Sequence, residues 1–204
     1  SNKKDLFFYF NVDLHKLVNA PQNNNKEEIE KAQKVLEEAN QKLSVAIKKA
    51  EEAKSAEREQ KSTEAEVERA CNELKKQEDE YEKTTQKLKF NSNDESKGIV
   101  FRNRSKNELQ QHLSKDTLGL RSAKIKQEAA LRKAKLATEK AQKLREMAEQ
   151  ALKEAEQAFK VAQDFLEEVK NKGGSGQGSV YVIEKKLHEA KRYLPQSKGG
   201  ISRD

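Results

Sequence analysis

The sequence has no tryptophan, only two prolines and a single cysteine, Cys71, in 204 residues. One thiol cannot form an internal disulfide, which fits a reducing, cytoplasmic environment. No run of about 18 apolar residues is present, so no segment is typical of a membrane span. The first residues do not form a signal peptide. The apolar segment Leu6–Phe10 begins so abruptly that we expect more of the protein to precede it.

The residues that are abundant favour long helices. Charged residues make up 38% of the chain and hydrophobic residues only 33%. Alanine, lysine, glutamate and glutamine dominate, and all are good helix formers. This composition is typical of a coiled coil and holds too little apolar bulk for a compact globule. The net charge of +7 indicates an acidic partner, such as nucleic acid, an anionic membrane or an acidic protein surface.

Helix-breaking residues divide the chain into segments. No proline or glycine interrupts Lys26 to Phe90, whereas Asn91–Arg104 is rich in turn formers, and Ser105 with Glu108 then forms a capping box. We expect an N-terminal apolar helix and linker at 1–25, a helical hairpin at 26–170 (helices 26–90 and 105–170, tip loop 91–104), a Gly/Ser linker at 171–179, a short helix at 180–195 and a polar tail at 196–204. Gly119 is the weakest point of the second long helix.

Apolar residues recur at alternating steps of four and three along the second helix, as in a coiled-coil seam. The positions are Ala130, Ala134, Ala137, Ala141, Leu144, Ala148, Ala151, Ala155, Ala158, Ala162, Phe165 and Val169. The matching series in the first helix is Ile29, Ala32, Leu36, Ala39, Leu43, Ala46, Ala50 and Ala53. That register then fails at Glu57, Gln60 and Glu64. It resumes at Val67, Ala70, Leu74, Tyr81 and Leu88 with an offset of three, a stammer that overwinds a coiled coil locally.

The near-equal helices predict an antiparallel hairpin in which facing residue numbers sum to roughly 195. Leu36 would then lie near Phe159, and Leu88 near Lys106. A second apolar row, Leu152, Phe159 and Leu166, needs a further cover. The candidates are the N-terminal segment Leu6–Val18 and the short C-terminal helix. The predicted fold is all-α: a long antiparallel two-helix coiled-coil hairpin with a small helical head at its base formed by these two segments.

Residues for catalysis are hard to find. His15, His112 and His188 are far apart in sequence, and no metal-binding or acid–base motif occurs. The glycine-rich segment KGGSGQGS, residues 172–179, lacks the spacing of a phosphate-binding loop. Paired helices are also not expected to form a concave pocket. We therefore expect no catalytic residues, no metal, no cofactor in this chain and no enzymatic activity.

A basic block is the clearest functional signal. Between Arg102 and Arg145, thirteen lysines and arginines stand against four acids. The block either forms ion pairs across the hairpin or is an electrostatic footprint for an acidic polymer. Aromatic residues do not interleave with it, so nucleic acid is not an expected partner. The candidate partner-binding residues are Arg102, Arg104, Arg121, Lys124, Lys126, Arg132, Lys133, Lys135, Lys140 and Lys143.

Three stretches carry a family resemblance: EIEKAQKVLEEANQK at 28–42, SKGIV at 96–100 leading through Lys106–Leu113, and the tail 180–198 with its run EKKLHEAKRYLPQSK. Together they resemble the C-terminal helical region of the calcium-regulated actin-bundling proteins, the EF-hand actin cross-linkers of amoeboid cells. The resemblance implies F-actin binding and bundling at the cytoskeleton. It also implies calcium regulation through EF-hands, which this chain lacks.

The leading hypothesis is an actin-binding and bundling protein that docks its basic coiled-coil arm on the acidic filament. Bundling needs two attachment sites, which a second site or self-association, including a domain-swapped dimer, would supply. Two alternatives stay open: a non-catalytic coiled-coil spacer or scaffold, and a peripheral membrane-binding module. Membrane binding is less favoured because the polar faces lack a broad outward apolar stripe.

Overall fold

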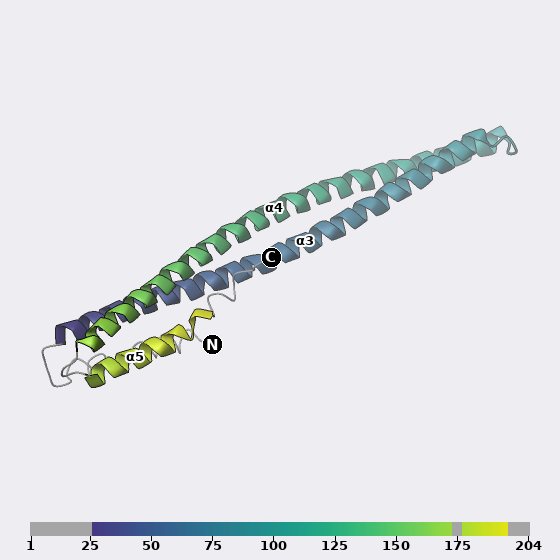
Figure 1. Ribbon diagram of the computed structural model, residues 1–204. Helices are drawn as coiled ribbons and strands as arrows, with labels where there is room; N and C mark the ends of the chain where they lie inside the picture. Colours follow the sequence, from purple (N-terminus) through teal and green to yellow (C-terminus); the bar gives the residue numbers. More distant parts are fainter. Residues whose placement is uncertain (1–25, 173–176, 196–204) are drawn as a thin grey trace. The chain divides into compact units, whose positions relative to one another are not determined.

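The computed structural model describes residues 26–172 and 177–195. Three α-helices make up nearly all of this part of the chain, and it contains no strand: α3 (Lys26–Asn93), α4 (Ile99–Asn171) and α5 (Gln177–Lys191) (Figure 1). The two long helices are antiparallel and pack together, which confirms the predicted all-α hairpin with a short C-terminal helix. The predicted N-terminal helix, with Leu6–Val18, lies outside the described residues.

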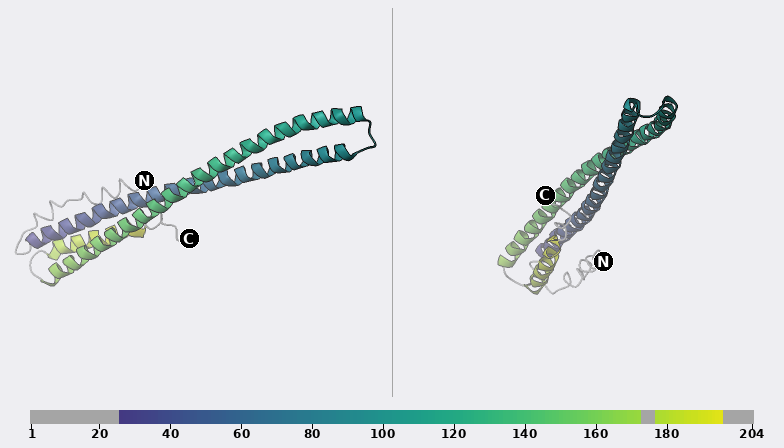
Figure 2. Two further views of the ribbon diagram at one scale, coloured as in Figure 1. Left: turned by 90° about the horizontal axis from the view of Figure 1, so that it is seen from above. Right: turned by 90° about the vertical axis from the view of Figure 1, so that its right-hand side faces the viewer.

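The chain divides into two compact units, and each is described by itself. Among the described residues, the three-helix unit comprises 26–57, 140–172 and 177–195, and contains α5 with the beginning of α3 and the end of α4. The two-helix unit comprises residues 58–139, and contains the rest of α3 and α4 with the turn that joins them (Figure 2).

Large side chains fill the core of the three-helix unit. Phe159 and Leu43 are the largest fully buried side chains of the described residues. One apolar cluster joins all three helices and contains Leu36 together with Phe159, as the antiparallel register predicts. The members from α5 are Val180, Ile183, Leu187 and Ala190. The second apolar row of α4 is therefore covered here, and the expectation that α5 contributes to a helical head is confirmed.

The two-helix unit has a thinner core. Its buried apolar side chains are Leu74, Ala123 and Ala137, while Thr63, Thr84 and Asp116 are buried polar residues. The Thr84 hydroxyl donates a hydrogen bond of 2.6 Å to Asp116 Oδ2. A polar pair inside a narrow seam adds little stability but favours one register over its neighbours.

The offset of three in the seam of α3 is visible in the burial of its residues. Within the three-helix unit, Ala50, Ala53 and Ala56 are all buried at successive steps of three. In the two-helix unit the series continues with Gln60, half-buried, and Thr63, buried. The register is thus offset between Ala53 and Ala56, and α3 stays continuous through this region.

Glu57 and Glu64 do not enter the seam. Glu57 is half-buried and forms an ion pair of 3.0 Å with Arg145 within the three-helix unit, and Glu64 is exposed. Cross-helix ion pairs also check the antiparallel register. Lys42 lies 3.9 Å from Glu154 in the three-helix unit, and Lys133 lies 3.3 Å from Glu66 in the two-helix unit. These residue numbers sum to 196 and 199, close to the predicted value.

The turn between α3 and α4 is shorter than predicted. The expected tip loop 91–104 contracts to residues 94–98, because α3 continues to Asn93 and α4 begins at Ile99, not at Ser105. The Asp94 carboxylate accepts hydrogen bonds from the Ser96 amide, at 3.1 Å, and from its hydroxyl. The Gly98 carbonyl accepts the first helical bond of α4 from the Arg102 amide, at 3.0 Å.

The predicted capping box is therefore wrong, because Ser105 and Glu108 lie inside α4. An aspartate–serine turn of this kind satisfies the backbone within a few residues, which lets both helices run closer to their junction. At the other end, α5 begins at Gln177 and ends at Lys191, three residues before its predicted start and four before its predicted end.

Candidate functional site

Most of the candidate cations lie on the outer surface of α4 in the two-helix unit. We define the basic face as the exposed side chains of Arg121, Lys124, Lys126, Arg132, Lys133 and Lys135. Glu128 is the one acid of α4 within this stretch. The basic face therefore concentrates positive charge on one helix.

The helical repeat explains why these cations point outward. Ala123 and Ala137 are buried, and Gln127, Ala130 and Ala134 are half-buried, so they form the side of α4 that packs on α3. Each cation of the basic face falls between these seam positions, on the sides of the helix that the seam does not use.

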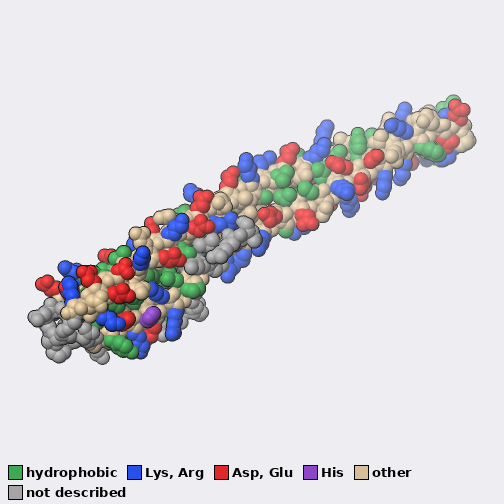
Figure 3. Space-filling view, in the orientation of Figure 1, with side chains coloured by type: hydrophobic (Ala, Val, Ile, Leu, Met, Phe, Trp, Pro, Cys, Tyr) green, Lys and Arg blue, Asp and Glu red, His purple; other side chains and the backbone are tan. Residues whose placement is uncertain are grey.

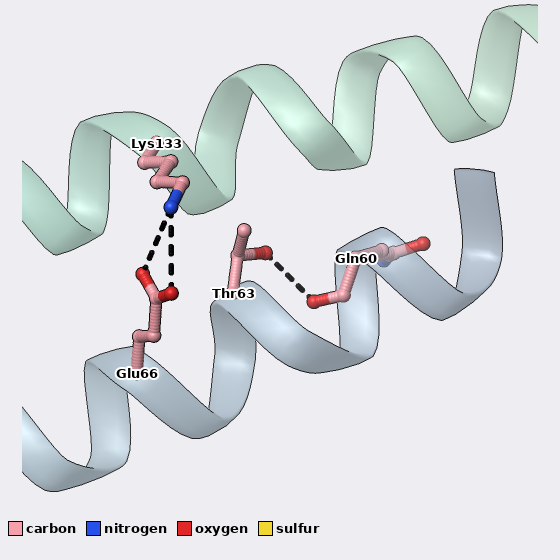
Figure 4. Close-up of polar contacts among 4 residues, drawn as sticks. All are labelled: Gln60, Thr63, Glu66 and Lys133. Atoms are coloured by element: carbon pink, nitrogen blue, oxygen red, sulfur yellow. Dashed lines mark hydrogen bonds and ion pairs between the residues drawn. The ribbon is translucent and has the colours of Figure 1, made fainter. Parts of the chain in front are cut away.

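One cation of the basic face is paired across the unit. Lys133 Nζ lies 3.3 Å from both carboxylate oxygens of Glu66 (Figure 4). The Lys133 side chain stays 61% exposed in this pair, and an exposed pair contributes at most about 1 kcal/mol. The other five cations form no ion pair with any residue that the structure describes. This favours an electrostatic footprint over a set of cross-hairpin ion pairs.

The remaining candidates are dispersed. Arg102 is half-buried beside the turn, where its carbonyl accepts a 3.0 Å hydrogen bond from Asn91 Nδ2, and Arg104 is exposed nearby. Lys140 and Lys143 are exposed but belong to the three-helix unit. Elsewhere the surface carries both signs of charge, and Figure 3 shows acidic and basic side chains interspersed on the face in view.

An open groove near the turn departs from the expectation that paired helices offer no concave surface. It has a volume of about 940 Å³ in the two-helix unit and lies beside exposed Phe90. Its walls are formed by Lys83, Gln86, Lys87, Phe90, Asn91, Ser105, Glu108, Leu109 and His112. His112 is thus exposed in the groove and does not face the seam. No cluster of three or more potential metal ligands occurs in residues 26–172 and 177–195.

Sequence reasoning missed a row of apolar side chains on the outside of α4. Leu118, Ile125 and Leu136 are 65%, 64% and 67% exposed, within the same stretch as the basic face. Their signal was present in the sequence, because they follow the four–three repeat on the side of α4 opposite the seam. The buried Thr84–Asp116 pair was also missed, because nothing in the local sequence marks a polar residue as buried.

These features define a class of protein: a coiled-coil hairpin that presents its charged groups on an exposed helix surface. Among the residues described, no helix combines the length and apolar character needed to cross a bilayer. The family model described as "F actin bundling C terminal" matches residues 28–164. The match spans about two thirds of the chain, and the chain belongs to this F-actin-bundling C-terminal family.

The match covers two of the three stretches that carried the resemblance, 28–42 and 96–113, while the tail 180–198 lies outside it. No curated protein matches the chain significantly, and no solved structure does.

Proposed function

We propose that this chain binds actin filaments through the basic face of α4 and bundles them, as a non-catalytic, cofactor-free component of the cytoplasmic actin cytoskeleton. The observation that carries this proposal is the set of exposed cations on α4 outside its seam, five of them without an ion-pair partner among the described residues. Membership of an F-actin-bundling family supports actin as the acidic partner.

Filament binding by the basic face would rest on several weak electrostatic contacts made at the same time. Each exposed lysine or arginine contributes little by itself, but several cations held on one helix engage an acidic polymer together. Such an attraction also speeds the encounter between partners and weakens as ionic strength rises. Filament binding should therefore fall steadily with added salt.

Co-sedimentation with actin filaments tests the proposal. The test variant reverses Lys124, Lys126, Arg132, Lys133 and Lys135 to glutamate. The control variant reverses five exposed lysines of the three-helix unit: Lys31, Lys34, Lys48, Lys54 and Lys160. The wild-type chain and the control should pellet with filaments at low salt, and the test variant should remain in the supernatant. Equal pelleting of the two variants, or no pelleting of the wild type, would reject the proposal.

Bundling is a separate measurement from binding. Low-speed centrifugation collects bundles, whereas single filaments stay in solution, so it reports whether one particle holds two filaments. Sedimentation equilibrium without actin tells whether the second attachment comes from self-association or from a second site on the same chain. If the second attachment comes from self-association, dilution below the dissociation constant of that self-association should abolish bundling. If it comes from a second site on the same chain, dilution should leave bundling unchanged.

On the resemblance alone, we further propose that calcium regulates this protein through EF-hands that lie outside the present chain. EF-hands are absent from this chain, so its own filament binding should be the same with calcium and with a chelator. A version that includes EF-hands should respond to calcium. A calcium response by the present chain would contradict the proposal that EF-hands outside the chain carry the regulation.

Peripheral membrane binding is the second candidate, because the exposed apolar row of α4 offers side chains that could enter a membrane interface. The row is narrow, however, and an interfacial helix buries a broad apolar face. Flotation with vesicles that contain anionic lipid decides between the two candidates. A spacer or scaffold would bind neither filaments nor vesicles and would not respond to the charge reversals.

A further inference from the structure

The outward face of α4 in the two-helix unit carries a second heptad row. Starting at residue 118 and advancing by alternating steps of four and three, the row contains Leu118, Ser122, Ile125, Ala129, Arg132 and Leu136, and every one is exposed. The row spans about 27 Å at 1.5 Å per residue. Because the same repeat places Ala123, Ala130 and Ala137 in the seam, this outer row lies on the opposite side of the helix.

The large apolar side chains of this row are concentrated beside the basic face. Continued past Leu136 to the end of the two-helix unit and through the three-helix unit, the same repeat meets only charged and amide side chains: Glu139, Lys143, Glu146, Gln150, Lys153, Gln157, Lys160 and Asp164. The corresponding outward row on α3 in the two-helix unit is also polar apart from one alanine: Lys61, Ala65, Glu68, Asn72, Lys75, Asp79, Glu82 and Gln86. Towards the turn, the row continues through Lys115, Gln111, Glu108 and Arg104 to exposed Phe101. Between residues 104 and 164, large apolar side chains thus occupy the outer row only where the basic face lies.

The three-helix unit shows how a second row is used when it has a cover. In that unit, Phe159 and Leu166 are not part of the alanine-rich seam series of α4. They lie in one apolar cluster with side chains of α5. No described element covers Leu118, Ile125 and Leu136 in the two-helix unit. Exposed apolar side chains gathered on one surface are a common mark of an interaction site.

The charges around the outer row indicate which kind of partner can cover it. Six cations and one acid share α4 with the row between residues 118 and 136. A second copy docked through the same row would bring these cations against each other, which opposes association. A partner with acidic side chains around apolar ones is complementary to both parts of the surface.

We propose that the outer row, Leu118–Ile125–Leu136, is an apolar docking strip for the actin filament, set within the basic face. This inference rests on the function proposed above and adds a contact to it. The cations attract the filament, and the three side chains are then covered by apolar groups of the filament surface. Apolar contact is not screened by salt, so part of the binding should persist where purely electrostatic binding is lost.

Filament co-sedimentation over a salt series tests the strip, with the triple variant Leu118→Gln, Ile125→Gln and Leu136→Gln. The control is Val45→Gln with Val161→Gln, two side chains that are 51% and 52% exposed in the three-helix unit. Glutamine is a good helix former, so circular dichroism should show unchanged helix content in both variants. The triple variant should bind roughly ten- to a hundredfold more weakly than wild type, and the control should bind normally. At high salt, only the triple variant should lose all pelleting.

The outcomes separate the two proposals. If the wild type does not pellet at any salt concentration, the proposed function falls and the strip falls with it. If the wild type pellets and the triple variant matches it across the series, the strip is overturned while the function stands. Equal weakening of the control overturns the strip as well. The strip is also overturned if the triple variant binds filaments normally but loses self-association, measured by sedimentation equilibrium. The same holds if it binds filaments normally but loses vesicle binding, measured by flotation.

Discussion

The two units of this chain use the same pair of helices in different ways. In the three-helix unit, Phe159, Leu166 and Val169 are buried, and α5 adds its own apolar side chains to the cluster. In the two-helix unit the buried seam residues are mostly small or polar, and several larger apolar side chains of α4, such as Ile125, are exposed. Large apolar side chains thus fill the core of the first unit, whereas several of them lie at the surface of the second.

The sharpest way to test this comparison is to shorten one large side chain in each unit. Phe159→Ala should lower the free energy of unfolding by about 3–5 kcal/mol, because it opens a cavity in a packed core. Leu118→Ala, which is on the surface, should change it by less than about 0.5 kcal/mol. Urea denaturation followed by circular dichroism measures both. Similar losses for the two variants would show that Leu118 is covered in solution.

A second test replaces the buried polar pair of the two-helix unit. Thr84→Val should cost about 1–3 kcal/mol, because the Asp116 carboxylate loses its 2.6 Å hydrogen bond while it stays buried. Adding Asp116→Leu should recover that loss, since an apolar pair suits the seam. Thermal denaturation of the two variants gives the comparison. A double variant less stable than Thr84→Val would mean that the pair stabilises the unit and does not only select its register.

A third test concerns Gly119, where the two helices approach closely. A Cβ atom there would lie 2.6 Å from Gln77 Oε1, which is the far end of a flexible side chain. If that amide moves aside, Gly119→Ala should raise stability by up to about 1 kcal/mol through helix propensity. A lower melting temperature would instead show that Gln77 is held in place. Restoration by Gln77→Ala in the Gly119→Ala background would then confirm the clash.

The smallest expected effects are on pH dependence, and they have opposite signs in the two units. Hydrogen bonds from Ser96 lower the pKa of Asp94 below its ordinary value of 3.8. The stabilisation of the turn is therefore present above that value and is lost as pH falls through the lowered pKa. Amide exchange of Ser96, compared between wild type and Asp94→Ala, measures it. Equal exchange rates at neutral pH would contradict the role of Asp94.

In the three-helix unit, the hydrogen bond to Glu28, at 2.7 Å, raises the pKa of Lys172 above its ordinary value of 10.5. That stabilisation is present below 10.5 and is lost as pH rises through the raised pKa. The Lys172→Met variant should show no such alkaline step in NMR titration of the neighbouring residues. The same step in wild type and variant would assign it to another group.

Periodicity was enough to predict the fold. The four–three repeat predicted two long helices and the offset of three, because seam residues must be apolar wherever two helices pack. The near-equal lengths of the two helices predicted their antiparallel pairing. The second row of α4 predicted a cover for the three-helix unit, and α5 supplies it. Helix ends were less predictable, because the turn depends on hydrogen bonds of Asp94 and Asn91 that no repeat reveals.

The surface was harder to predict than the seam. The excess of lysine and arginine was plain in the sequence, but which of them face outward without an ion pair depends on the positions of Glu66 and its neighbours across the unit. The seam repeat does not predict Leu118, Ile125 and Leu136, because it marks only the side of α4 that packs on α3. The same four–three repeat on the opposite side of the helix contains them.

The contrast between the outward rows of α3 and α4 makes the two-helix unit one-sided. Leu118, Ile125 and the surrounding cations lie on one side of it, while the outward row of α3, with Lys61, Glu68 and Asp79, carries charges of both signs. On the proposed function, a one-sided unit would hold one filament at a time. Joining two neighbouring filaments would then take a pair of chains standing back to back, or a separate point of attachment elsewhere on the chain, and the spacing of the bundle would report which of the two is used.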